Sequence, residues 1–459
     1  MELEGKKIIV AGTGKSGIAA ANLLGKIGSE VILYNSDEGT DFDAVSKELE
    51  TGFEVEFLCG DISVSYYDEE HIDLLVVSPG IPLGLDFIKN AEEAKVPVWG
   101  EVELAYVAGK GKVIGITGTN GKTTTTSLVG EIMESHFDDV KVVGNIGIPY
   151  TTVAYESTDD TVTVAEISSF QLETVHSFNP DVSAILNITP DHLNRHGTMD
   201  VYVDMKLRIA KNQDNDEPVV LNFEDEILRS RADEFTNKII WFSSKQKVPQ
   251  GVYLDGEDIV YFDPEVNEAP IKVCNKNETT LVGIHNLENI MAAVAIAINM
   301  GVPVDKIRES IKNFKAVPHR IEYVNTINDV IFYNDSKGTN TDASIKAIEA
   351  MSRPTILVAG GYDKEVSFEE WASAFGDKVK CLVVLGQTAD QIEKTVKSHG
   401  FENVIKAESL EEAVDKCFEN AEPGDAVLLS PACASWGMFD NYEQRGDMFK
   451  EYVNARESK

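Results

Sequence analysis

Long apolar runs and paired cysteines are both missing from this sequence of 459 residues. No stretch holds 18 consecutive apolar residues, and the N-terminus lacks the charged head and apolar run of a signal peptide, so we expect neither a membrane span nor export. The five cysteines lie far apart and form no CxxC pair. This spacing argues against a disulfide framework or a structural zinc site and favours reduced thiols in the cytoplasm.

Positive charge is also scarce, since 41 Lys and Arg face 77 Asp and Glu for a formal net charge of −36. This acidity argues against a general nucleic-acid binder. Hydrophobic residues make up 43% and charged residues 26%, which are ordinary values for a globular chain, so the acidity does not indicate a disordered tail.

The chain is too long for one core, because cores stop growing beyond roughly 250–300 residues. Short apolar segments alternate with segments of helical periodicity, which predicts parallel sheets wrapped by helices. Three such series follow one another, with boundaries near Gly109–Gly111 and near Pro318. We therefore expect an α/β protein of three doubly wound domains, comprising residues 1–109, 110–317 and 318–459.

A glycine-rich loop, Gly12-Thr13-Gly14-Lys15-Ser16-Gly17, follows the first apolar segment and precedes a helical one. This GxGxxG pattern predicts a Rossmann-like first domain that binds a phosphate-containing ligand at a helix N-terminus, although a packing turn without ligand is the alternative. The next strand ends Tyr34-Asn35-Ser36-Asp37, so the acid that would hold a dinucleotide ribose is displaced. This weakens a nicotinamide assignment and leaves another nucleotide diphosphate open.

A second glycine-rich loop, Gly115 to Thr123, lies between a predicted strand and a predicted helix. Its backbone NH groups would cradle phosphates, Lys122 would reach the terminal ones, and the Thr123 hydroxyl could ligate Mg²⁺. The glycine spacing departs from GxxxxGK[ST], and a turn with an accidental lysine is the alternative. We expect a central domain like the P-loop ATPases that hydrolyses ATP or GTP.

The loop Gly118 to Thr124 resembles that of the Mur ligases, which build the peptide of bacterial cell-wall precursors. Further motifs resemble this family in the same order, at residues 144–147, 166–172, 187–192, 285–289, 318–320 and 334–340. The segment 430–446 is similar to that of the family's D-glutamate-adding members, and the Asp-Asn-Pro-Arg motif of its diamino-acid-adding members is missing.

The resemblance implies an ATP-dependent ligase of peptidoglycan precursor synthesis. Such an enzyme joins the carboxylate of UDP-N-acetylmuramoyl-L-alanine to the amine of D-glutamate through an acyl phosphate and a tetrahedral intermediate, releasing ADP and phosphate. The first domain would bind the UDP-substrate, the central one ATP, and the Rossmann-like third one the amino acid. A cytoplasmic monomer is expected, with the third domain closing onto the second from a hinge near Pro318.

The resemblance also implies ATP contacts, two Mg²⁺ ions and a catalytic set. Asn286 could instead be a plain N-cap, Glu166 could merely cap a turn with Ser168 and Ser169, and the residues alone favour a solvated Lys206 over one modified by CO₂ to a carbamate. The ATP contacts are Gly118, Thr119, Asn120, Gly121, Lys122, Thr123, Thr124, Asn286, Asn289, Arg320 and Asp335. The metal ligands are Thr123, Glu166, His192 and carbamylated Lys206, and the catalytic residues are Lys122, Glu166, His192, Lys206 and Lys337.

Two substrate sites follow from the same resemblance. Core packing is the alternative for Trp436 and Tyr442, and we expect Arg195 and His196 at the surface or in supporting positions. The UDP-substrate would contact Gly14, Lys15, Ser16, Asn35, Ser36, Ser78, Gly80, Asn145 and His192. D-glutamate would contact Lys337, Thr339, Lys364, Ser435, Trp436 and Tyr442.

Three other functions fit fewer of these features. A folylpolyglutamate synthetase shares the nucleotide loop but usually lacks an N-terminal GxGxxG domain. A nicotinamide-dependent oxidoreductase leaves the second loop unexplained. A nonenzymatic nucleotide-binding regulator would keep Lys122 but has no need for the further set of Glu166, His192, Lys337 and Lys364.

Overall fold

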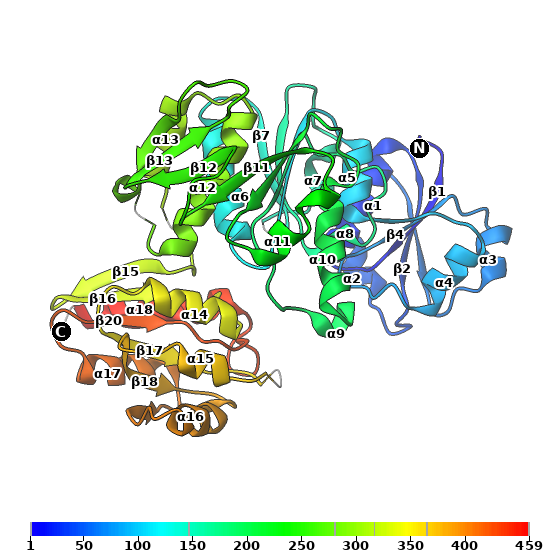
Figure 1. The fold of residues 1–459 in the computed structure, drawn as a ribbon. Coiled ribbons are helices and arrows are strands. Elements are labelled where there is room, and N and C mark those ends of the chain that lie inside the picture. The colour runs from blue at the N-terminus through cyan, green and yellow to red at the C-terminus, as the bar shows by residue number, and fades with distance from the viewer. Residues whose placement is uncertain (1, 146, 280, 316, 364–365, 458–459) are drawn as a thin grey trace. The chain divides into compact units, whose positions relative to one another are not determined.

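The computed structural model describes residues 2–145, 147–279, 281–315, 317–363 and 366–457 and contains three sheets flanked by helices (Figure 1). The chain forms two compact units. The first unit comprises residues 1–278 and 288–312, and the second comprises residues 279–287 and 313–459. The predicted α/β class is confirmed, whereas the domain boundaries after residues 109 and 317 stay predictions.

The first sheet is entirely parallel, with the strand order β3-β2-β1-β4-β5. Its central strands are continuous apolar runs because helices cover both faces. The order reverses between β1 and β4, so the loops that follow these two strands meet at a switch point where α/β proteins bind ligands. The elements are β1 (Lys7–Ala11), α1 (Lys15–Ile27), β2 (Glu30–Asn35), α2 (Phe42–Ser46), β3 (Val55–Cys59), α3 (Val64–Glu69), β4 (Leu74–Val77), α4 (Asp86–Glu93), β5 (Val98–Gly100) and α5 (Glu101–Ala108).

The second sheet has nine strands in the order β14-β13-β12-β11-β10-β9-β6-β8-β7. Its parallel part carries the phosphate loop between β6 and α6. The elements up to residue 210 are β6 (Lys112–Thr117), α6 (Lys122–Glu134), β7 (Val140–Gly144), α7 (Thr151–Ala154), β8 (Val162–Glu166), α8 (Ser169–Leu172), β9 (Val182–Ile185), α9 (Leu193–His196), α10 (Met199–Leu207) and the 3-10 turn η1 (Arg208–Ala210).

An antiparallel extension of this sheet was not predicted. Strand β12 continues into β13 through a two-residue turn, with Asp255 opposite Asp258 and Gly256 in the left-handed region at φ 67°. These strands are short and only partly apolar, so they escape a search for long apolar runs. The remaining elements are β10 (Pro218–Asn222), α11 (Glu226–Ser230), η2 (Ala232–Glu234), β11 (Lys238–Ser243), β12 (Gly251–Asp255), β13 (Asp258–Phe262), β14 (Ile271–Asn275), η3 (Lys276–Glu278), α12 (Ile284–Asn299) and α13 (Val304–Asn313).

The third sheet lies in the second unit and has the order β15-β16-β20-β17-β18-β19, with only β15 antiparallel. The loops after β16, β20 and β17 therefore leave the same edge of the sheet. The elements are β15 (Glu322–Ile327), β16 (Val330–Asn334), α14 (Thr341–Ala350), β17 (Thr355–Ala359), α15 (Glu369–Ser373), β18 (Val379–Val384), α16 (Ala389–Ser398), β19 (Val404–Lys406), α17 (Leu410–Asn420), β20 (Ala426–Leu429) and α18 (Tyr442–Glu457).

Buried carboxylates of α5 fasten the first sheet to the second. Glu101 accepts hydrogen bonds from the backbone NH and the hydroxyl of Thr151, at 2.9 and 3.2 Å. Glu103 accepts from the backbone NH groups of His176, Ser177 and Phe178. Such buried polar groups are tolerated because several donors satisfy them. Within the described part of the chain, no helix is long and apolar enough to cross a membrane.

Candidate active site

The phosphate loop joins β6 to α6 and depends on glycine. Gly118 and Gly121 have φ of 150° and 84°, in the region that side chains rarely adopt. A Cβ atom on Gly121 would also clash with Oδ1 of Asn289. The predicted adenine neighbour Asn289 therefore lies directly against the loop.

Asn187, which sequence reasoning passed over, anchors this loop. Its Oδ1 accepts from the Asn120 backbone NH at 2.8 Å, and its Nδ2 donates to the Asn120 carbonyl at 3.0 Å. The Thr119 NH donates to the Asn187 carbonyl at 2.9 Å. The available signal was the position of Asn187 at the start of the motif 187–192, directly after a buried strand.

Two lysines converge on the loop. Lys122 Nζ donates to the carbonyls of Gly118 and Thr119, both at 2.9 Å, and Lys206 Nζ donates to the Gly118 carbonyl at 2.8 Å. Lys206 is only 2% exposed and its Nζ lies 4.7 Å from the ring centroid of Tyr202. The residues alone favoured a solvated Lys206, and this prediction is wrong. Helix α10 packs the face that carries Lys206 against the loop.

Burial lowers the pKa of Lys206 well below its usual range, and the Lys122 ammonium lowers it further, while Asp191 opposes them. Desolvation penalises the charged amine, and a second cation nearby adds to the penalty. Lys206 is thus set up to carry a neutral amine.

Glu166 ends β8 and is 1% exposed. Its Oε1 accepts from Asn145 Nδ2 at 2.9 Å, while its buried Oε2 has no hydrogen-bond partner within the described residues. Ser168, rather than Glu166, caps α8 in a capping box with Gln171. A buried carboxylate oxygen without a donor fits a site that receives a cation.

His192 opens α9 with a left-handed backbone at φ 52°. Its half-exposed ring lies 4.8 Å from that of Phe170, and Nε2 is 3.5 Å from an oxygen of Asp191. In the described ranges, no three His, Cys, Asp or Glu side chains gather into a metal-binding group. The predicted set of metal ligands differs from such a group, because it also includes the hydroxyl of the buried Thr123 and the carbamylated Lys206.

Arg195 and His196 are not surface residues. The side chain of Arg195 is 16% exposed and pairs with Glu173 at 2.6 Å, while the buried His196 places Nε2 3.0 Å from the Ser169 hydroxyl. Of the two expected positions, at the surface or in support of other residues, the structure shows the supporting one, because both side chains pack against α8.

The predicted UDP-substrate residues of the first domain lie at or just after the ends of β1, β2 and β4, at the edge where the first sheet reverses its order, whereas Asn145 follows β7 and His192 precedes α9. Gly14 caps α1, and Asn35 Nδ2 donates to the Thr13 hydroxyl at 3.0 Å. Ser78 Oγ is buried without a partner within the described residues, and a Cβ on Gly12 would come within 2.5 Å of it. The displaced acid Asp37 accepts from the Gly39 NH at 2.8 Å.

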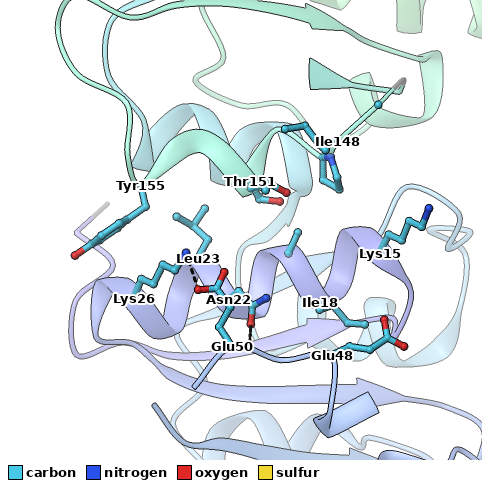
Figure 2. A pocket seen from close by; sticks show the side chains of 14 residues that line it. Lys15, Ile18, Asn22, Leu23, Lys26, Glu48, Glu50, Ile148, Thr151 and Tyr155 are labelled. Atoms are coloured by element: carbon cyan, nitrogen blue, oxygen red, sulfur yellow. Dashed lines mark hydrogen bonds and ion pairs between the residues drawn. The ribbon is translucent and has the colours of Figure 1, made fainter. Parts of the chain in front are cut away.

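Figure 2 shows how α1 faces the second domain. A pocket of about 330 Å³ lies between α1 and the segment 147–155, with Lys15 at one end and Ile148 opposite the helix. Lys26 and Glu50 form an ion pair at 2.9 Å on its rim. Ser36, Gly80 and Asn145 are exposed. Lys15 and the loop that carries Asn145 therefore border the same boundary between the two domains.

In the second unit, the loops after β16 and β20 meet at Asp335. Its Oδ2 accepts from the Ser430 hydroxyl at 2.7 Å and its Oδ1 from the Ile321 NH at 3.3 Å. Burial raises the pKa of Asp335 to about 7, although Ser430 and Arg320 counteract it. The Arg320 Nε is buried without a hydrogen-bond partner among the described residues.

Four of the predicted D-glutamate residues, Lys337, Thr339, Ser435 and Trp436, lie in the loops that follow β16 and β20, and Tyr442 begins α18. Lys337 Nζ is 5.2 Å from the ring centroid of Tyr442, Thr339 is half-buried, and Ser435 is buried. Trp436 is 57% exposed, so core packing is wrong for this residue, although its ring contacts that of Tyr362. Lys364 lies outside the described residues.

Arg445 is a second residue that sequence reasoning passed over. Its buried guanidinium donates to the hydroxyl and the carbonyl of Ser336, at 2.9 and 2.7 Å, and to the carbonyl of Cys433 at 3.3 Å. It thus ties the loop of Lys337 to the loop of Ser435. The signal was an arginine inside the motif-bearing segment 430–446.

Asn286 is not an N-cap, because α12 already begins at Ile284. Its Nδ2 donates back to the carbonyl of Val282 at 2.8 Å. Its expected contact with adenine stays a prediction.

Three family models match the chain. They are the Mur ligase MurD-like N-terminal domain at residues 6–100, the Mur ligase middle domain at residues 116–297, and the Mur ligase glutamate ligase domain at residues 319–433.

Curated relatives match the chain over nearly its whole length. It is 52% identical over 457 residues to the UDP-N-acetylmuramoylalanine–D-glutamate ligase of Lachnospira eligens, covering 99% of this chain and 100% of that protein. It is 51% identical over 455 residues to the enzyme of the same description from Lachnoclostridium phytofermentans, covering 99% of both chains.

Solved structures share the fold at low sequence identity. The UDP-N-acetylmuramate-alanine ligase of Thermotoga maritima is 20% identical with a TM-score of 0.60, covering 98% of this chain and 99% of that one. The MurF ligase of Thermotoga maritima in complex with ADP is 15% identical with a TM-score of 0.59, covering 99% of this chain and 100% of that one.

Proposed function

Since this chain belongs to the Mur ligase family, as its motifs predicted, we propose that it joins D-glutamate to UDP-N-acetylmuramoyl-L-alanine in peptidoglycan precursor synthesis. The observation that carries this proposal is the identity of 51–52% to D-glutamate ligases over almost the entire chain. The reaction uses ATP and Mg²⁺. The enzyme activates the substrate carboxylate as an acyl phosphate, which the amine of D-glutamate then attacks.

The first unit supplies the residues for carboxylate activation. The amides of residues 118–124 and the Lys122 ammonium hold the ATP phosphates, and Lys122 needs only to exchange two carbonyl acceptors for phosphate oxygens. Thr123, Glu166 and His192 would hold Mg²⁺, which supplies charge neutralisation between the phosphates and the carboxylate. The unpartnered Glu166 Oε2 supports this assignment.

Lys206 serves the same site as a carbamate. Formation of a carbamate from CO₂ requires a neutral amine, and burial favours that form of Lys206. The modification turns this neutral amine into an anionic oxygen ligand beside the Lys122 ammonium. The two side chains then attract each other, and the site gains a metal ligand.

Ribose and amino-acid recognition belong to the second unit. Asp335 contacts the ATP ribose, and Arg320 the phosphates. Lys337, Thr339, Lys364, Ser435, Trp436 and Tyr442 bind D-glutamate and the transferred phosphate. Arginine and lysine at these positions offset the overall charge of −36, which would otherwise repel three anionic ligands. The enzyme works as a monomer in the cytoplasm.

Phosphate release tests the proposal. The protein is incubated with ATP, Mg²⁺ and UDP-N-acetylmuramoyl-L-alanine, and D-glutamate is compared with L-glutamate, L-lysine and L-alanine. Release should depend on D-glutamate and on the UDP-substrate together. Release that is indifferent to D-glutamate would refute the assignment.

A further inference from the structure

The turn after β4 forms one wall of the glycine loop of the first domain. Ser78 NH donates to the Ala11 carbonyl at 3.1 Å, and the turn closes through a bond from Ile81 NH to the Ser78 carbonyl at 3.0 Å. Added Cβ atoms on Gly12 and Gly17 would lie 2.5 and 3.3 Å from Ser78 Oγ. The position of the turn at residues 78–81 therefore determines the shape of the proposed UDP-substrate site.

An arginine of the second domain reaches this turn. Arg195 Nη1 donates to the Pro79 carbonyl at 3.0 Å, and its Nη2 donates to the Ile81 carbonyl at 3.1 Å. A planar guanidinium can serve two acceptors at a fixed separation, which a lysine ammonium on a flexible stem does not do.

The guanidinium is itself held in place by a carboxylate and by an aromatic ring. Its Nε and Nη2 donate to the two carboxylate oxygens of Glu173, at 3.2 and 2.6 Å, and its carbon lies 4.2 Å from the ring centroid of Phe170. The side chains of Arg195 and Glu173 are 16% and 12% exposed. A bidentate pair that is largely shielded from water has one geometry, so Arg195 presents its remaining NH groups in a fixed direction.

The same carboxylate continues toward the active-site segment after β8. Glu173 Oε1 lies 3.5 Å from His196 Nδ1, and His196 Nε2 lies 3.0 Å from the Ser169 hydroxyl. Burial lowers the pKa of His196, which favours the neutral form of this ring, while Glu173 opposes the shift. A continuous set of contacts thus runs from the first domain's turn to the segment that follows Glu166.

We propose that Arg195 is a positioning residue for the UDP-substrate. It fixes the turn at residues 78–81 against the glycine loop from across the domain boundary and thereby sets the affinity for the uridine nucleotide. This inference rests on the proposed function. It assigns Arg195 no contact with the reacting atoms.

Steady-state kinetics of Arg195→Lys tests the proposal, because this variant keeps the positive charge and loses the planar guanidinium that serves two carbonyl acceptors. The KM for UDP-N-acetylmuramoyl-L-alanine should rise about tenfold, since misplacement of a binding wall weakens every contact on it. kcat and the KM values for ATP and D-glutamate should stay within about twofold, as expected when uniform binding of one substrate is lost.

Arg208→Lys is the matched control. Arg208 also donates to two backbone carbonyls, those of Glu173 and Val175 at 2.9 and 2.8 Å, but both belong to the second domain. This variant should leave the KM for the UDP-substrate unchanged. Equal effects of the two variants, or an unchanged KM in Arg195→Lys, would overturn the proposal.

A second variant covers the case in which Arg195→Lys does not fold. Glu173→Gln keeps Arg195 and removes the charge that orients it, so calorimetric titration with UDP-N-acetylmuramoyl-L-alanine should show several-fold weaker binding. Unchanged affinity in this variant would also contradict the proposal. An inactive wild-type enzyme would instead refute the proposed function, which separates the two failures.

Discussion

Lys122 and Lys206 donate to the same acceptor, the carbonyl of Gly118, at 2.9 and 2.8 Å. Two ammonium groups on one carbonyl repel each other, and Lys206 is the more buried of the two. The strain is relieved when Lys206 carries a neutral amine or an anionic carbamate. The shared carbonyl therefore places the proposed metal ligand, carbamylated Lys206, directly beside the nucleotide loop.

Replacement of Lys206 by Ala should lower kcat by a hundredfold or more, on the order expected for loss of a charged group that acts on the transition state. Added short-chain carboxylates should restore part of the activity, because they can supply the missing anionic oxygen. Lys211→Ala, at an exposed lysine nearby, is the control and should behave as wild type. Full activity of Lys206→Ala without any carboxylate would exclude the carbamate.

Glu166→Gln should strongly reduce Mg²⁺-dependent phosphate release while the protein stays folded. The amide oxygen can still accept from Asn145 Nδ2, whereas the amide nitrogen cannot bind a cation. We expect a loss of about a hundredfold or more in kcat and a small change in melting temperature. Glu131→Gln on α6 serves as control. Retention of activity in Glu166→Gln would remove Glu166 from the metal site.

Gly121→Ala should destabilise the protein and weaken ATP binding together. The backbone φ of 84° costs roughly 1–2 kcal/mol for a residue with a Cβ, and the clash with Asn289 adds to this. Gly256→Ala is matched in conformation, with φ 67° and open space around its Cβ, and lies in the hairpin β12–β13. Melting curves and nucleotide titrations should show a stability loss in both variants and weakened ATP binding only in Gly121→Ala.

Asp335 should make the stability of the free enzyme fall as pH rises from about 4 to about 7. Its pKa in the folded protein is about 7, raised by burial from the ordinary value of 3.8, so the native state binds more protons than the unfolded state across this range. Asp335→Asn removes this dependence. Relative to wild type, the variant should gain stability as pH rises through this window, by at most about 4 kcal/mol.

Thermal unfolding of both proteins at pH 4.5 and pH 7.5 measures the effect. The melting temperature of Asp335→Asn minus that of wild type should be more positive at the higher pH. A difference that stays constant or narrows with pH would show that Asp335 is ionised in the folded enzyme throughout.

The sequence by itself determined the class of fold and the family. Glycine-rich loops between short apolar strands and helices are local patterns, because a tight turn and a helix N-terminus require glycine at particular positions whatever surrounds them. Gly118 and Gly121 were identified in this way, and both adopt left-handed backbone conformations. The ordered motifs from residue 118 to residue 446 indicated the family that the comparisons then established.

Only the tertiary structure decided which side chains are removed from water and what they contact. The residues alone favoured a solvated Lys206, whereas α10 packs this lysine against the phosphate loop. They left Arg195 and His196 at the surface or in supporting positions, and the packing of α9 against α8 decides for the supporting position. Asn187 and Arg445 became visible as anchors only when loops distant in the sequence were brought together. Burial, and the pKa shifts that follow from it, depend on residues that are distant in the sequence. The bond between Asn187 and Asn120 spans 67 positions, and the bond between Arg445 and Ser336 spans 109. No local sequence pattern records such neighbours.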